Sequence, residues 1–126
     1  MKTSVALLMP LMLLFTSVAF AKRSAPARVA PVKAGAIEYR VSHNQMGSIE
    51  AWDATGSELI WRRQIYVVKY QVGLERDIQD VFITTVELAG DHLLVKNERG
   101  SDYQLDLGTL AVKVLKGNLV ETTKIK

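Results

Sequence analysis

The 126-residue sequence contains no cysteine. This absence excludes disulfide bonds, thiol catalysis and zinc sites with cysteine ligands. The sequence also has no Gly-rich phosphate-binding loop, no G-x-S-x-G segment and no H-x-x-x-H spacing. Hypotheses of nucleotide binding, serine hydrolysis or zinc catalysis therefore lack their motifs. We expect a protein that is not an enzyme and that holds no cofactor or metal ion.

Proline is scarce, and none follows Pro31. Two of the three prolines fall between Lys22 and Gly35, in a segment of alanine and basic residues that shows no apolar period. Because proline interrupts regular structure, we predict a flexible linker over residues 22–35.

Long hydrophobic runs are missing except near the N-terminus. There, an apolar run from Val5 to Phe15 follows Lys2 and leads to an A-x-A sequence that ends at Ala21. This order is typical of a signal peptide, and the run is too short for a stable membrane anchor, which needs about 20 residues. We predict a signal peptide over residues 1–21, cleaved after Ala21, and a periplasmic or secreted bacterial protein.

The positive charge of the chain belongs to its ends. The formal net charge is +3, yet residues 36–115 contain 8 basic and 12 acidic residues. Nucleic-acid binding favours a basic stripe with aromatic platforms. An acidic domain behind a signal peptide therefore argues against a nucleic-acid partner.

After Gly35 the apolar residues follow a period of two, which is typical of strands. Turn residues interrupt the pattern about every ten positions. We predict an all-β domain over residues 36–118, with seven or eight short antiparallel strands in two meanders, and a C-terminal tail over residues 119–126. Only the charged segment from Gly73 to Asp80 breaks the rhythm, and we expect a loop or one helical turn there.

Two segments of the predicted domain share a hairpin pattern. In residues 47–61, Gly-Ser opens a strand that ends at Asp53, and Thr55 and Gly56 follow before the next strand. Residues 100–112 repeat this order loosely, with Asp106 in the equivalent place. We expect each aspartate carboxylate to accept hydrogen bonds from backbone N–H groups of its own turn.

The first segment resembles the blade motif of the quinoprotein-like (PQQ-like) β-propeller repeat, a motif that also occurs singly in small exported bacterial proteins. The matching residues are Ala51, Asp53, Thr55, Gly56 and Trp61. A blade has four strands and roughly 40 residues, so this domain has room for about two blades. Two blades cannot close a ring, and the family's central channel and its cofactor site therefore do not carry over. The resemblance implies an incomplete propeller, packed as a sandwich or a partly open barrel.

Aromatic residues are few, and three of them are candidates for a partner surface: Trp52, Tyr66 and Tyr70. Trp61 holds the motif position that packs against the sheet, so we predict that it belongs to the core. Trp52 alternates with Ala51 and points to the opposite face, where burial or exposure for binding are both open.

The second candidate surface is the acidic cluster in the predicted loop, formed by Glu75, Asp77 and Asp80. It lacks the D-x-D-x-D-G spacing of a calcium loop, which favours a solvated acidic segment. The two histidines, His43 and His92, lie in predicted turns far apart in the sequence, and we expect both to be solvated.

These features favour a non-catalytic protein that acts by contact in the bacterial envelope. Its exposed strand edges would pair with an envelope protein or with a second copy. One alternative is an inhibitor of an envelope enzyme, which would present the loop of residues 75–80 to a cleft. Another is a small-ligand-binding protein that uses Trp52.

Overall fold

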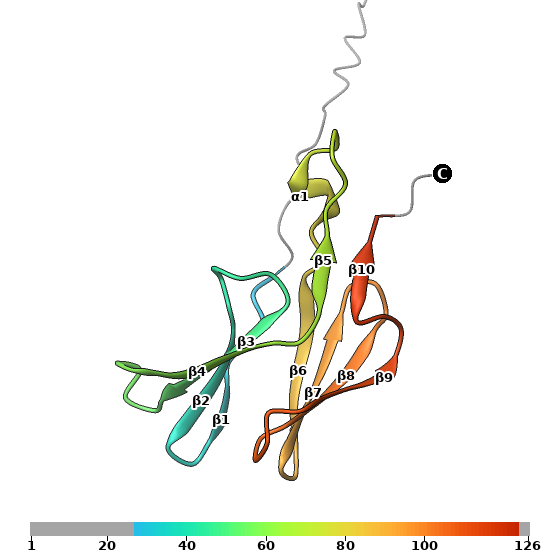
Figure 1. Cartoon of the computed structure of the whole chain (residues 1–126). Helices are drawn as coiled ribbons and strands as arrows, with labels where there is room; N and C mark the ends of the chain where they lie inside the picture. The colour runs from blue at the N-terminus through green and yellow to red at the C-terminus, as the bar shows by residue number, and fades with distance from the viewer. Residues whose placement is uncertain (1–26, 124–126) are drawn as a thin grey trace, which may run out of the picture.

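The computed structural model describes residues 27–123. The predicted signal peptide, the first part of the predicted linker and residues 124–126 lie outside the described residues. Within them the chain is all-β, as predicted, with one short helix and no closed barrel. The strands form two four-stranded sheets and one two-stranded sheet (Figure 1).

Each four-stranded sheet is an antiparallel meander whose strands follow the order of the chain. The first sheet consists of β1 (Val32–Ala34), β2 (Ile37–Val41), β3 (Ser48–Asp53) and β4 (Leu59–Gln64). The second sheet consists of β6 (Ile83–Ala89), β7 (His92–Asn97), β8 (Asp102–Asp106) and β9 (Val112–Lys116). The prediction of two meanders is thus confirmed.

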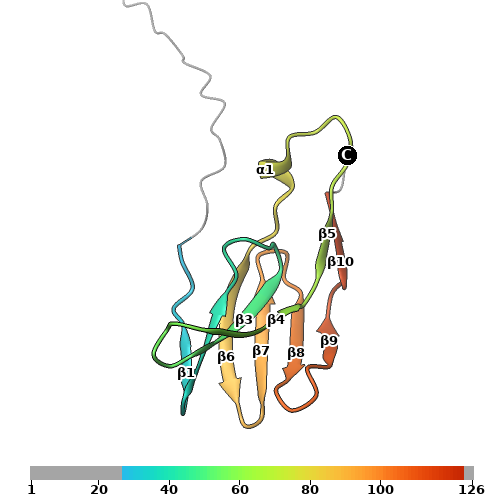
Figure 2. The ribbon, with the colours of Figure 1, turned by 60° about the vertical axis from the view of Figure 1, so that its left-hand side comes forward.

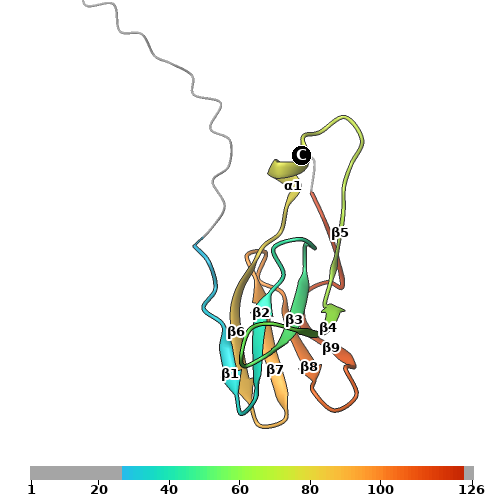
Figure 3. The ribbon, with the colours of Figure 1, turned by 90° about the vertical axis from the view of Figure 1, so that its left-hand side faces the viewer.

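The two sheets face each other as two layers (Figures 2 and 3). Alternate residues of both sheets point inward, and together they form one hydrophobic core. Its central members are fully buried: Ile49, Ala51, Leu93, Val95 and Leu105. This alternation is the period of two seen in the sequence, since successive strand residues point to opposite faces.

The chain crosses from the first sheet to the second through two consecutive buried residues, Ile65 and Tyr66. A strand with one covered face buries every second residue, so two buried neighbours mark a segment enclosed on both sides. Gly47 contacts this segment, and its carbonyl accepts a hydrogen bond from the Ile65 amide at 2.8 Å. The run of strand formers from Leu59 to Val72 is therefore broken into β4 and β5 (Val67–Lys69).

Beyond the sheets, β5 pairs in parallel with β10 (Val120–Thr122), and α1 (Arg76–Gln79) caps the same end (Figure 1). Of the loop or helical turn expected between Gly73 and Asp80, the structure has the helical turn.

Ten strands are present in the described residues, more than the seven or eight predicted, and the β5–β10 pair is parallel. Two of them fall outside the predicted domain limits of 36–118. β1 lies in the predicted linker, where its three residues pair with β2 directly after Pro31. β10 lies in the predicted tail, where the buried side chain of Glu121 fixes it against the second sheet. Three-residue strands are too short to show a period in the sequence.

Candidate interaction surfaces

The hairpin between β3 and β4 has the geometry expected from its sequence. The Asp53 carboxylate accepts a hydrogen bond from the Thr55 amide at 3.2 Å, and the Gly56 amide donates to the Asp53 carbonyl at 2.6 Å. Gly56 has a φ of 77°, a conformation that glycine adopts at little cost. The aspartate turn predicted for this hairpin is confirmed.

The hairpin between β8 and β9 uses the same device. Oδ1 of Asp106 accepts hydrogen bonds from the amides of Gly108 and Thr109, both at 2.8 Å. The bond from Thr109, then that from Gly108, holds the pKa of the Asp106 carboxyl below its usual value. In both of the similar segments, the aspartate carboxylate therefore stabilises its own turn by accepting backbone hydrogen bonds.

The remaining residues of the blade-like motif contribute to the core. Ala51 is fully buried. Trp61 packs against the core as predicted, with its ring centroid 5.9 Å from that of Tyr39. These contacts give the motif a structural role in the hairpin and the core.

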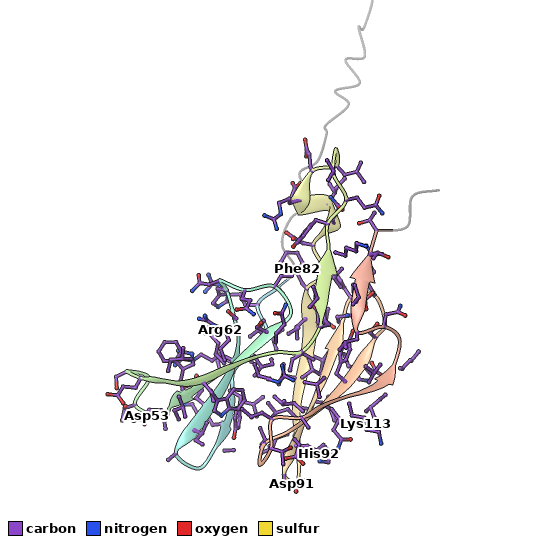
Figure 4. All side chains as sticks on the ribbon, in the orientation of Figure 1. Asp53, Arg62, Phe82, Asp91, His92 and Lys113 are labelled. Carbon is purple, nitrogen blue, oxygen red and sulfur yellow. The ribbon has the colours of Figure 1, made fainter. Side chains whose placement is uncertain are left out.

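The outer face of the first sheet carries four charged residues around Trp52, which we name the ladder: Glu38, Arg40, Glu50 and Arg62. Arg62 donates two hydrogen bonds to Oε2 of Glu50, at 2.6 and 2.8 Å, and the Trp52 indole N–H donates to Oε1 at 3.1 Å. Arg40 lies over the Trp52 ring at 5.1 Å and forms an ion pair with Glu38 at 3.2 Å. Figure 4 shows Arg62 and Asp53 on this sheet.

The ladder keeps its carboxylates ionised. Burial raises the pKa of Glu50, but the hydrogen bonds from Arg62, Trp52 and Ser42 outweigh burial, and the net pKa lies below its usual value. In Glu38 the hydrogen bond from Arg40 is the main cause of a lowered pKa. Two ionised carboxylates that already have arginine partners are poor proton donors.

This arrangement predicts an acid-sensitive contribution to stability. A carboxyl with a lowered pKa in the folded state stabilises the protein above its unfolded pKa, about 4.3, and this contribution is lost as the pH falls below that value. In urea unfolding from pH 7 to pH 3, Glu50→Gln should lose less stability with acid than the wild type. Glu87→Gln, at an exposed position of β6, is the matched control and should follow the wild-type profile. Identical profiles for Glu50→Gln and the wild type would contradict the role of the ladder.

Tyr66 does not belong to a partner surface, and its prediction as a surface residue is wrong. Its side chain is 1% exposed and stacks on Tyr103, with ring centroids 5.3 Å apart. The Tyr66 hydroxyl donates a hydrogen bond to the Val81 carbonyl, and burial raises its pKa. The reason is the crossing between the sheets, which encloses Tyr66 on both sides.

Tyr70 and Asp80 are brought together at the end of the molecule that carries α1. The Tyr70 hydroxyl donates to the Asp80 carboxylate at 2.5 Å, and the Arg76 guanidinium lies 4.3 Å from the centre of the Tyr70 ring. Burial, then the bond to Asp80, raises the pKa of Tyr70 to about 12. Tyr70 and the acidic loop therefore form one surface, while the contacts of Trp52 lie within the ladder on the first sheet.

The segment from Gln71 to Asp80, which we name the projecting loop, extends beyond the sheets (Figure 1). It is organised by Gln79, whose side chain is fully buried. The Gln79 amide accepts from the Gln71 N–H at 2.6 Å and donates toward the carbonyls of Gln71, Leu74 and Glu75 at 3.2–3.3 Å. Around this amide the loop exposes Val72, Leu74, Glu75 and Ile78, whereas Asp77 is half-buried.

Gln79→Glu should loosen the projecting loop without unfolding the sheets. A carboxylate has nearly the same shape but cannot donate to the carbonyls that face the amide, and each unmet buried group costs about 1–3 kcal/mol. We expect faster amide exchange and proteolysis between residues 71 and 80. Glu75→Gln makes the reverse change at an exposed site and serves as the control. Unchanged exchange in Gln79→Glu would show that other contacts hold the loop.

One edge of the second sheet is open. In the described part of the chain β9 pairs with β8 alone, and four of its five residues are exposed. A cavity of about 290 Å³ lies beside it, lined by the crossing segment Arg63–Val67, by Val112 and by Leu119. We name this cavity the β9 groove. The opposite edge strand, β6, lies near β1 of the first sheet.

The two histidines lie in different sheets or turns and do not share a contact among those that the structure shows. His43 is exposed, and Nδ1 of His92 lies 3.3 Å from the Asp91 carboxylate. Among residues 27–123, no group of three or more histidine, cysteine, aspartate or glutamate residues is placed to hold a metal ion. No helix in the same range is long and apolar enough to cross a membrane.

No protein-family model and no curated protein matches the sequence, so neither comparison supplies a relative from which a function could be transferred. The function must therefore be argued from the surfaces described above.

Proposed function

We propose that the protein is an exported, non-catalytic module of the bacterial envelope that acts by binding another protein. The observation that carries this proposal is the open edge of β9, an exposed strand without proline beside an apolar groove. Edge strands expose unpaired backbone groups that readily pair with another chain, and natural proteins usually block them. The predicted signal peptide supports an envelope or secreted location.

A second candidate function is inhibition of an envelope enzyme by the projecting loop. The observation that favours it is the Gln79 amide, which holds the loop in one shape while Leu74 and Ile78 remain exposed. A loop ordered before binding loses little conformational entropy when it enters a cleft.

Capture from envelope extract on the immobilised mature chain separates these candidates. Val114→Lys places a charge on the inner side of the β9 edge, and the double variant Leu74→Ser, Ile78→Ser removes the apolar tip of the loop. A partner lost only with Val114→Lys supports edge binding, and a partner lost only with the loop variant supports inhibition. A partner that survives both changes would contradict both proposals.

A further inference from the structure

The β9 groove is lined by apolar residues together with Gln64 and Arg63. Two lining residues, Val67 and Leu119, are each about half exposed, as is Val120, which pairs with Val67, and Val114 of β9 is 37% exposed. Among the described residues that line the groove none is acidic, whereas Arg63 is one of them. Such a surface would bury apolar side chains and attract negative charge.

The register of β9 fixes what an added strand would meet. Val112 and Val114 pair with Leu105 and Tyr103, whose side chains are buried, so these valines lie on the inner side of the sheet. Lys113 pairs with Gln104 and lies on the outer side, at the margin of the second sheet in Figure 4. Apolar and basic positions therefore alternate along the open edge from Val112 to Val114, and a register shift at Leu115 ends this alternation.

A strand that pairs with β9 continues this alternation, because neighbouring strands place side chains of the same face side by side. Its inner residues would stand beside Val112 and Val114 and enter the groove, which favours apolar side chains. Its outer residues would stand beside Lys113, which favours acidic side chains. The partner segment defined by the edge thus alternates apolar and acidic residues.

The two ends of the chain do not have this composition. Residues 22–31, ahead of β1, contain three basic residues, two prolines and no acidic residue, and the last three residues include Lys124 and Lys126. A second copy that offered its own β9 edge would bring Lys113 and Lys116 close to the same residues of the first copy. Like charges on paired strands are destabilising, so charge complementarity points to another protein.

We propose that the β9 edge and the β9 groove bind an extended segment of another protein in which apolar residues alternate with acidic ones. The segment adds a fifth strand to the second sheet and fills the groove with its apolar side chains. This inference rests on the proposed function and specifies the chemistry of its partner.

Two labelled heptapeptides test the proposal by fluorescence anisotropy with the mature chain. One alternates valine with glutamate, and the other alternates valine with lysine. We expect the glutamate peptide to bind more tightly by up to about fivefold, since one opposite-charge pair across strands contributes up to about 1 kcal/mol. The preference should weaken as salt is added.

Lys113→Glu should reverse the preference, so that the lysine peptide binds more tightly. Lys96→Glu is the matched control, because Lys96 is exposed on the same sheet but lies on the central strand β7. It should leave the preference for glutamate intact.

Equal binding of the two peptides, or a preference unaffected by Lys113→Glu, would contradict the inference that the partner segment is acidic. If a captured partner is nevertheless lost with Val114→Lys, the proposed function of binding through the β9 edge would still be supported. If neither peptide binds and capture also survives Val114→Lys, both fail. A dimer in sedimentation that dissociates in Val114→Lys would show that a second copy occupies the edge, and would overturn the choice of another protein.

Discussion

Gly47→Ala should destabilise the protein by about 3 kcal/mol or more in urea unfolding, because it combines a strained backbone with a steric clash. Gly47 has a φ of 74°, and a Cβ atom there would lie 2.4 Å from the Tyr66 carbonyl oxygen. That oxygen belongs to the buried crossing segment, which cannot move without opening the core between the sheets.

Gly100→Ala provides the matched control for this prediction. Gly100 has a φ of 80°, but a Cβ atom at this position would meet nothing within 4 Å. It should therefore lose only the conformational part, about 1–2 kcal/mol. Similar losses in the two variants would show that the crossing segment has room to adjust at Gly47.

Glu121→Ala should destabilise the protein by about 2–4 kcal/mol, because it leaves buried donors without an acceptor. Glu121 is 4% exposed, and its Oε1 accepts hydrogen bonds from Asn97 at 3.0 Å and from Ser101 at 2.5 Å. Without the carboxylate, β10 keeps its three-residue backbone pairing with β5 and a long hydrogen bond, 3.5 Å, from the Arg99 guanidinium to the Thr122 carbonyl.

Amide exchange can locate the damage in Glu121→Ala. The Val67 amide donates to the Leu119 carbonyl and should exchange faster, whereas the Ile65 amide donates to Gly47 and should keep its protection. Glu121→Gln retains an acceptor oxygen and should lose less stability. Thr122→Ala, at an exposed position of β10, should change the free energy of unfolding by less than about 0.5 kcal/mol. Equal protection of Val67 in Glu121→Ala and the wild type would contradict the anchoring role.

Much of the fold follows from local signals in the sequence. The period of two located most of the strands of both meanders, and the aspartates at the ends of β3 and β8 marked their turns. These signals can be read because each depends on residues within a few positions of one another. The same holds for the helical turn of α1, which interrupts the strand pattern with charge.

Features made by distant segments could not be predicted in this way. Tyr66 lies in an unbroken run of strand formers, and only the crossing over Gly47 explains why it is buried. Gln79 resembles any polar loop residue until the loop brings three carbonyl groups around its amide. β10 is placed by Glu121, whose hydrogen-bond partners lie on the second sheet.

Of the candidate surfaces, the sequence suggested the acidic loop, Tyr70 and the exposed strand edges. It did not show which edge of the second sheet is open. That depends on the contact of β1 with β6 at the other edge, which joins segments far apart in the sequence. The alternation of Val112, Lys113 and Val114 was visible, but its meaning depends on β9 being last in its sheet.

The parallel pairing of β5 with β10 has a consequence for folding kinetics. The hairpins of both meanders join neighbouring segments and close short loops, whereas β5 meets β10 only after the whole second sheet lies between them in the chain. Contacts of long sequence separation carry a high entropic cost and tend to form late. Changes in β10 should therefore accelerate unfolding and leave the refolding rate almost unchanged, so that a strand of three residues governs how long the folded protein lasts.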